Sequence, residues 1–109
     1  MSGVEPGQEL TVSIRREARS AVIELAGELD LHESRRLSAA VAEILSERVE
    51  LVELDATALT FIDSAGLRAI LLARAGAAEQ GVTFLISGVS PQIRRVMEIA
   101  GAEDLLPDD

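Results

Sequence analysis

The sequence predicts an α/β domain with a mixed sheet of four to five strands, an antiparallel first strand pair, and helices packed on the sheet. Three observations predict this class. The first apolar stretch alternates with polar residues, as a half-buried strand does. Later apolar stretches repeat every three or four residues, as amphipathic helices do. Short strand-like runs then stand between these helices, which favours parallel strands joined by right-handed crossovers. The order is therefore β-β-α-β-α-β-α within one domain of 109 residues.

The first quarter of the chain predicts a leader and a hairpin. Residues 1–8 hold glycine and proline among polar neighbours, which indicates a flexible leader, so the domain spans 9–109. From residue 9 to 15 apolar and polar residues alternate, which predicts a strand. A polar turn at 16–20 leads to a second strand, 21–26, the hairpin partner of the first. Residues 27–30, Gly-Glu-Leu-Asp, are expected to end this strand.

The middle of the chain predicts a helix followed by a central strand. The helix runs from about residue 31 to 48, because its apolar residues recur at helical spacing: Leu37, Val41, Ile44 and Leu45. Asp30, His32 and Ser34 are all candidates for its cap. Residues 51–55 form a short strand with a helix on each side, the arrangement of a central parallel strand.

The last half predicts two more helices with a strand between them. One helix follows Ser64 and runs to about Gln80, where Gly81 ends it. Residues 82–86 form the next strand. Ser90 and Pro91 open the last helix, which continues to about Gly101, because cap followed by proline is a favoured helix start. Leu105 and Leu106 in the tail are expected to pack back on the sheet.

Composition bounds the core, the partners and the chemistry. Hydrophobic residues make up 48% of the chain and aromatic residues only 2%, so the core must consist of Val, Leu, Ile and Ala. The net charge of −9 disfavours nucleic acid and membrane surfaces and favours a protein partner with a basic or mixed face. The chain has no lysine and no cysteine, which excludes Schiff-base, P-loop lysine and thiol chemistry. It shows neither a bilayer-spanning run nor a signal peptide, so a cytoplasmic protein is expected.

The most informative segment is Asp63-Ser64-Ala65-Gly66, between a strand and a helix. In one interpretation it is a plain helix start, with Asp63 or Ser64 as cap and Gly66 permitting close backbone approach. In the other, Ser64 carries a phosphate. A phosphate at this place would meet unpaired amides and the positive end of the helix dipole.

Two motifs at matching separation resemble the STAS domain, specifically the bacterial anti-sigma factor antagonists, also called anti-anti-sigma factors. The signature positions that match are Asp55, Thr57, Leu59, Ile62, Asp63, Ser64, Ala65, Gly66 and Leu67. Residues 27–30 match the glycine-to-aspartate loop of the family, whereas Ala56 and Leu59 depart mildly from its commonest residues. The resemblance covers about residues 10 to 106. It implies that Ser64 is the phosphorylation site, that Asp63 is the neighbouring acid, and that Asp30 lies on the adjacent loop.

The same resemblance implies a regulatory protein with no enzymatic activity and no cofactor. In this family the unphosphorylated antagonist binds an anti-sigma factor that is also a serine kinase with a histidine-kinase-like ATPase fold, which frees the sigma factor. The kinase phosphorylates the serine, the complex weakens, and a metal-dependent serine phosphatase resets it. ATP and metal then belong to the partners.

A partner surface is expected around Ser64 and along the helix after it. Helical geometry places Leu67, Ile70 and Leu71 on one stripe, and Ala65, Arg68, Ala69 and Leu72 on a second face. This second face either packs on a neighbouring helix or docks a partner. The expected partner-binding residues are Asp30, His32, Asp63, Ala65, Gly66, Arg68 and Leu72.

Three alternatives remain. Within the fold, the chain is a STAS module of a stressosome-like complex or the subunit of a lipid transporter. From another class, it is a small serine hydrolase using Ser64 and His32, although the nucleophile-elbow glycine is missing because Ile62 stands two residues before Ser64. A metal site is not expected, because a single histidine and scattered carboxylates offer no ligand spacing.

Overall fold

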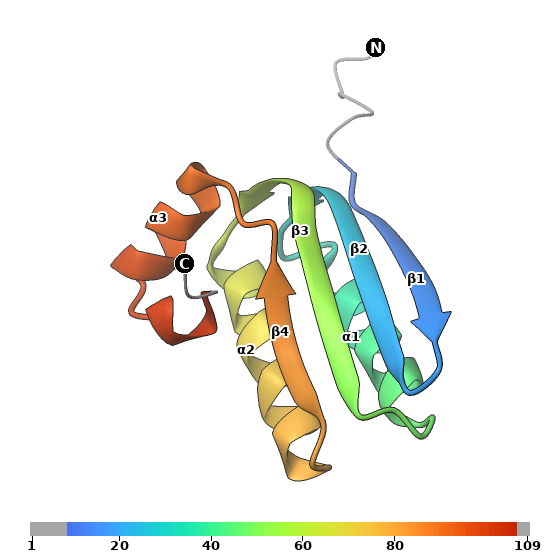
Figure 1. Ribbon diagram of the computed structural model, residues 1–109. Helices are drawn as coiled ribbons and strands as arrows, with labels where there is room; N and C mark the ends of the chain where they lie inside the picture. Colours follow the sequence, from blue (N-terminus) through green and yellow to red (C-terminus); the bar gives the residue numbers. More distant parts are fainter. Residues whose placement is uncertain (1–8, 107–109) are drawn as a thin grey trace.

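The computed structural model describes residues 9–106, so the expected leader, 1–8, and the last three residues lie outside it. Its centre is a four-stranded sheet in the order β1-β2-β3-β4 (Figure 1). The strands are β1 (Thr11–Glu17), β2 (Ser20–Leu29), β3 (Leu51–Ile62) and β4 (Thr83–Ser87). β1 is antiparallel to β2, while β3 is parallel to both β2 and β4. The predicted mixed sheet, with its antiparallel first pair, is confirmed.

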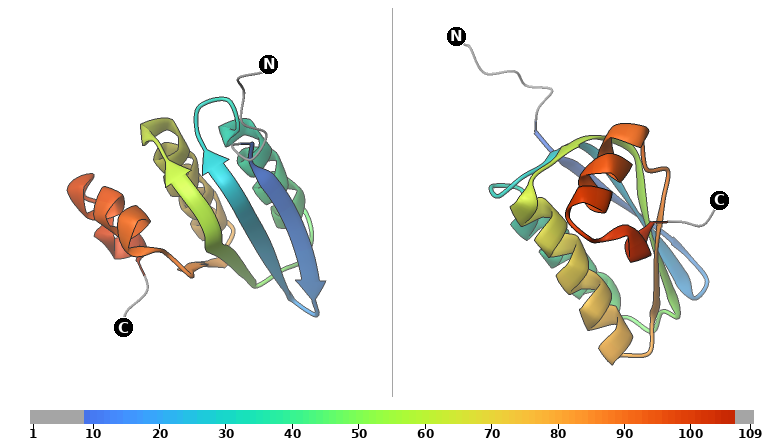
Figure 2. Two further views of the ribbon diagram at one scale, coloured as in Figure 1. Left: turned by 90° about the horizontal axis from the view of Figure 1, so that it is seen from above. Right: turned by 90° about the vertical axis from the view of Figure 1, so that its left-hand side faces the viewer.

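Helices cover one face of this sheet. α1 (Ser34–Leu45) and α2 (Ser64–Glu79) lie side by side behind the strands in Figure 1. α3 (Pro91–Ile99) and the short helix η2 (Glu103–Leu105) lie at the β4 side of the sheet (Figure 2). The face turned toward the viewer in Figure 1 carries no helix within residues 9–106. No helix in this part of the chain is both long enough and apolar enough to cross a bilayer.

The core fills the space between the sheet and the helices. Its buried residues are almost all aliphatic, with Met97 from α3 as the exception. Leu105 is buried in this core and Leu106 packs against it, which confirms the expectation for the tail. Of the two phenylalanines, Phe84 packs against the core, whereas Phe61 is exposed. Shape-matched aliphatic packing therefore stabilises this domain, as the composition predicted.

β2 and β3 are longer than predicted, because their pairing continues beyond two irregularities. The predicted ranges, 21–26 for the second strand and 51–55 for the central one, are wrong, because the strands continue to Leu29 and Ile62. The ladder shifts register between Glu24 and Ala26 and again after Gly27, whose φ is 105°. Pairing then continues to Leu29 opposite Ile62. Bulges of this kind carry a strand past residues that disfavour it.

The first helix is shorter than predicted. Residues 31–33 form a turn, and α1 begins at Ser34 and ends at Leu45. The Asp30 carbonyl accepts the amides of Glu33 and Ser34, at 3.1 and 2.8 Å, and its carboxylate accepts the Glu33 amide at 3.0 Å. None of the three expected caps stands at the cap position, which is Glu33. Asp30 instead stabilises the turn that precedes the helix.

Candidate functional site

The site lies where β2 and β3 end at the same edge of the sheet. Because these strands are parallel, the loop after β2 and the start of α2 after β3 adjoin. The Asp63 amide donates to the Leu29 carbonyl at 3.3 Å, which extends the strand pairing into the loops. The segment 30–33 and the segment 63–66 therefore form one surface.

The Asp63 carboxylate holds these two segments together. One oxygen, Oδ1, accepts the amide of Gly66 at 2.8 Å and so caps α2. The other, Oδ2, accepts the amide of Leu31 at 3.2 Å across the loops. The sequence left the cap of α2 open between Asp63 and Ser64, and the structure shows that it is Asp63. Both oxygens of its carboxylate accept backbone amides of the protein.

Ser64 is the first residue of α2, and its side chain is exposed. Because Asp63 serves as the cap, the Ser64 hydroxyl makes no hydrogen bond to another group of residues 9–106. The first amides of a helix lack partners within the helix and carry the positive end of its dipole. An accessible hydroxyl at this position can accept a phosphoryl group without breaking a contact of its own.

Gly66 lets the start of α2 approach the end of β2. A Cβ at this position would lie 2.2 Å from the Leu29 carbonyl oxygen and 2.9 Å from the Leu29 Cγ. Gly66 is buried, so it offers little surface to a partner. Its expected partner contact stays a prediction, while the close approach expected at this glycine is present.

The other expected partner residues surround this point. Asp30 and Ala65 are half-buried, whereas His32 and Arg68 are exposed. Leu72 is 58% exposed and lines a groove between α1 and α2 together with Leu45 and Gly76. Among the seven expected partner-binding residues, only Asp63 has a side chain with hydrogen bonds to both segments, 30–33 and 63–66, of the described chain.

Burial along α2 includes residues from both of the faces that the sequence distinguished. Leu67 and Ile70 are buried as expected, but Leu71 is exposed. On the second face, where both packing and partner docking were left open, Ala69 is buried while Arg68 and Leu72 are exposed. α2 packs against α1 and the sheet, and three of its buried residues are alanines: Ala69, Ala73 and Ala77.

Leu31 is a residue of this site that the sequence analysis missed. Its amide bonds to Asp63, and its side chain is 69% exposed at the tip of the turn. The only signal was its place outside the buried stripe of α1, in a polar loop. An apolar side chain so placed is free to contact a partner.

Neither metal binding nor hydrolysis gains support from this geometry. Within residues 9–106 no group of three histidine, cysteine or acidic side chains is placed to hold a metal ion. His32 is exposed, and no hydrogen bond of the described chain joins it to Ser64.

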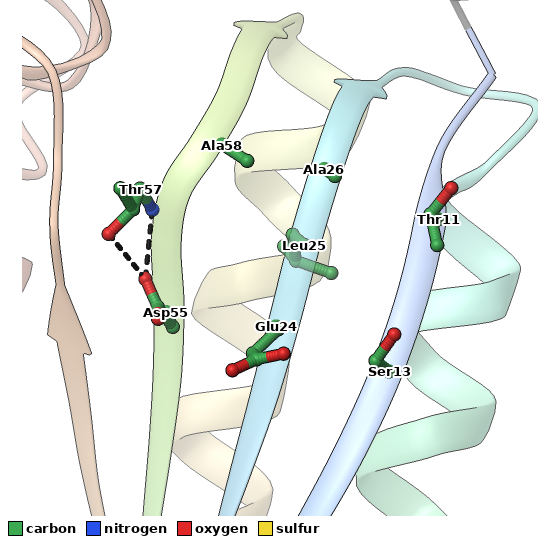
Figure 3. Close-up of a pocket in the computed structure, with 8 residues that line it drawn as sticks. All are labelled: Thr11, Ser13, Glu24, Leu25, Ala26, Asp55, Thr57 and Ala58. Atoms are coloured by element: carbon green, nitrogen blue, oxygen red, sulfur yellow. Dashed lines mark hydrogen bonds between the residues drawn. The ribbon is translucent and has the colours of Figure 1, made fainter.

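A separate hollow lies on the helix-free face of the sheet, lined by β1, β2 and β3 (Figure 3). Its carboxylates are Glu24 and Asp55. Asp55 Oδ1 accepts the Thr57 hydroxyl at 2.6 Å and the Thr57 amide at 2.9 Å. These two bonds lower the pKa of Asp55 below its ordinary value, and the bond from the Thr57 hydroxyl has the larger effect. Asp55 is therefore engaged in local structure.

Comparison with known proteins adds two findings. The family model described as "Mlab, STAS domain" matches residues 12–107. Solved structures with the same fold include the anti-sigma factor antagonist SpoIIAA in its unphosphorylated form, with a TM-score of 0.79 and 23% identity over 91% of this chain and 88% of that one.

Two further structures extend the range of proteins with this fold. An anti-sigma factor antagonist from Mycobacterium paratuberculosis has a TM-score of 0.81 and 18% identity over 95% of this chain and 88% of that one. A sulfate transporter family protein from Wolinella succinogenes has a TM-score of 0.73 and 20% identity over 84% and 74%. At these identities the likeness shows the fold.

Proposed function

Because this chain belongs to the STAS domain family, we propose that it is an anti-sigma factor antagonist whose partner binding is switched off by phosphorylation of Ser64. STAS is a regulatory and binding fold, and the solved structures of similar fold include anti-sigma factor antagonists. The observation that carries the proposal is the Ser64 hydroxyl, which is exposed and left unused by the helix cap.

In this proposal the unphosphorylated protein binds, in the cytoplasm, an anti-sigma factor serine kinase with a histidine-kinase-like ATPase fold. The bound kinase can no longer hold its sigma factor. It transfers the γ-phosphoryl group of ATP to the Ser64 oxygen, which releases ADP, and a base of the kinase accepts the serine proton. A metal-dependent phosphatase later hydrolyses the phosphoserine. The chain is substrate and ligand, and ATP and metal are held by its partners.

The start of α2 tolerates the phosphate, whereas a docked partner does not. Phosphoserine adds a charge of about −1.5 to −2. Within the fold this charge faces the amides and dipole of α2, but it stands beside the Asp63 carboxylate and near Asp30. A partner that desolvates this surface meets three negative groups instead of two, which weakens the complex.

The decisive experiment incubates the protein with candidate kinase and ATP and measures its intact mass. Addition of one phosphate, mapped to Ser64 and absent in Ser64→Ala, is the expected result. In a pull-down, Ser64→Ala should retain the kinase and Ser64→Asp should lose it. Equal binding of both variants and of wild type would contradict the switch.

A second candidate is a STAS module of a transporter assembly. It is favoured by the sulfate transporter family structure that shares this fold. That function predicts no phosphoryl transfer to Ser64 and predicts co-purification with a membrane transport protein.

A further inference from the structure

Two segments far apart in the sequence are joined by one carboxylate. Asp63 uses Oδ1 for the Gly66 amide at the start of α2 and Oδ2 for the Leu31 amide in the turn before α1. Both oxygens are therefore occupied before any modification. The residue that follows, Ser64, is the proposed phosphorylation site.

The turn at residues 30–33 depends on this link. Its other hydrogen bonds in the described chain are local. The Glu33 amide donates to Asp30, the Ser34 amide to the Asp30 carbonyl, and the Ser34 hydroxyl to the Leu31 carbonyl, while Glu33 accepts the amide and the guanidinium of Arg36. The bond from Leu31 to Asp63 is the one that ties the turn to α2. Loss of this bond frees the turn while leaving its internal bonds in place.

A phosphate on Ser64 acts directly on this carboxylate. It brings strong acceptor oxygens to the same helix end where Asp63 holds the Gly66 amide, and it repels the charge of Asp63. Displacement of Asp63 from either amide changes the geometry at the other, because both bonds belong to one rigid, planar group. The exposed Leu31 side chain then leaves the position that it has in this structure.

We propose that Asp63 transmits the phosphorylation of Ser64 to the turn at 30–33 by releasing the Leu31 amide. This inference rests on the proposed function and deepens it: the partner distinguishes the two forms by the position of the turn as well as by charge. Asp63 is in this sense a positioning residue. The partner class that the turn fits is a protein face that accepts the apolar Leu31 side chain beside the acidic Asp30.

The test uses protein with phosphoserine installed at residue 64 during translation, so that no kinase is needed. Two-dimensional amide NMR reports on Leu31 and Gly66. The expected result is a shifted Leu31 amide resonance that exchanges with water about five- to tenfold faster than in the unmodified protein, the effect of losing one hydrogen bond. An unchanged Leu31 amide in the phosphorylated protein overturns the proposal.

Two matched aspartate variants separate transmission from charge alone. Asp63→Asn supplies one acceptor oxygen for two amides, so it should cap α2 and still release Leu31 without any phosphate. Asp30→Asn removes the same charge from the same surface, but its single oxygen can still accept the Glu33 amide. The Leu31 resonance should therefore move in Asp63→Asn and stay in Asp30→Asn. Equal movement in both variants would assign the change to charge and contradict the proposal.

Failure of the coupling and failure of the proposed function give different results. If phosphoserine at 64 moves Leu31 but no kinase modifies Ser64, the coupling stands and the proposed switch falls. If the kinase modifies Ser64 but Leu31 does not move, the switch stands and the coupling falls.

Discussion

The starts of α2 and α3 follow the same plan with different residues. In each, a side-chain oxygen at the cap position accepts the amide of the third helical residue. Asp63 accepts from Gly66 at 2.8 Å, and Ser90 accepts from Ile93 at 3.1 Å. The first helical residue is a serine in α2 and Pro91 in α3.

This difference decides what each serine can do. The Ser90 oxygen is bound to a backbone amide, and the next residue, Pro91, has no amide to offer an anion. Ser64 stands one position later in its helix than Ser90 does. An aspartate therefore caps α2, and the Ser64 hydroxyl has no hydrogen bond to another residue of the described range, 9–106. A serine near a helix start is therefore a candidate for modification when another residue supplies the cap.

The third helical position gives the largest expected effect on stability. Gly66→Ala places a methyl group 2.2 Å from the Leu29 carbonyl oxygen, so α2 must move and its start must separate from β2. We expect the free energy of unfolding to fall by about 3 kcal/mol, as in overpacked cores. Urea denaturation followed by circular dichroism measures this change.

Gly76→Ala is the matched control for that prediction, since it makes the same substitution in the same helix. The nearest atom to its new methyl group is the Leu45 Cδ1 at 3.9 Å, an ordinary contact. Alanine should stabilise this helix by up to about 1 kcal/mol. Equal destabilisation by both substitutions would refute the close-packing argument at Gly66.

The next expected effect is on binding rather than stability. Phosphorylation of Ser64 should weaken the complex with the anti-sigma factor kinase about a hundredfold, which corresponds to about 2.7 kcal/mol. Isothermal titration of the phosphorylated and unmodified proteins measures the difference. The same titration with Ser90→Ala should give the affinity of wild type. A loss of affinity on removing the Ser90 hydroxyl would show that α3, too, contributes to the interface.

Ser90 should matter more than Ser64 for the free energy of unfolding, the reverse of their order for partner binding. Ser90→Ala loses a helix cap and should reduce the free energy of unfolding by about 1 kcal/mol. Ser64→Ala loses no hydrogen bond among the residues that the structure describes and should change the free energy of unfolding by less than about 0.5 kcal/mol. Thermal melts of the two variants give a direct comparison. A costly Ser64→Ala would mean that this hydroxyl belongs to the fold, against the argument above.

The sequence predicted the order of elements better than their ends. Alternation and helical spacing are local patterns, so they located the four strands and three α-helices that lie within residues 9–106. The continuation of β2 past Gly27 depends on its ladder with β3, which resumes after a register shift. No local pattern contains that information.

The site shows the same limit. The family motif placed Ser64 at a helix start, yet it left the cap open between Asp63 and Ser64, because both residue types are favoured there. Only the three-dimensional register of α2 decides between them. The bond from the Leu31 amide to Asp63 joins residues 32 positions apart. Its donor is a backbone amide, which nearly every residue type has, so the identity of residue 31 does not predict the bond.

The smallest expected effect concerns the support of the α3 start. The loop that leads to α3 passes close to Thr57: a Cβ at Gly88 would lie 2.1 Å from the Thr57 hydroxyl oxygen. That hydroxyl donates to Asp55 and lowers its pKa. Thr57→Val keeps the shape but removes the donor, so it should reduce the free energy of unfolding by about 1 kcal/mol or less at pH 7.

The pH dependence identifies the carboxylate as the source of this effect. A carboxyl group whose pKa is lowered by folding stabilises the fold above its unfolded pKa and loses this contribution as the pH falls through the folded pKa. The difference between wild type and Thr57→Val should therefore be constant near neutrality, begin to shrink as the pH falls to about 4, and vanish only below the lowered pKa of Asp55 in the folded protein. Thr60→Val on the same strand is the control, since the Thr60 hydroxyl donates to the uncharged Gly27 carbonyl at 3.0 Å. The loss of unfolding free energy in Thr60→Val should not change with pH. If the losses in Thr57→Val and Thr60→Val followed the same dependence on pH, Asp55 would not support the α3 start through its charge.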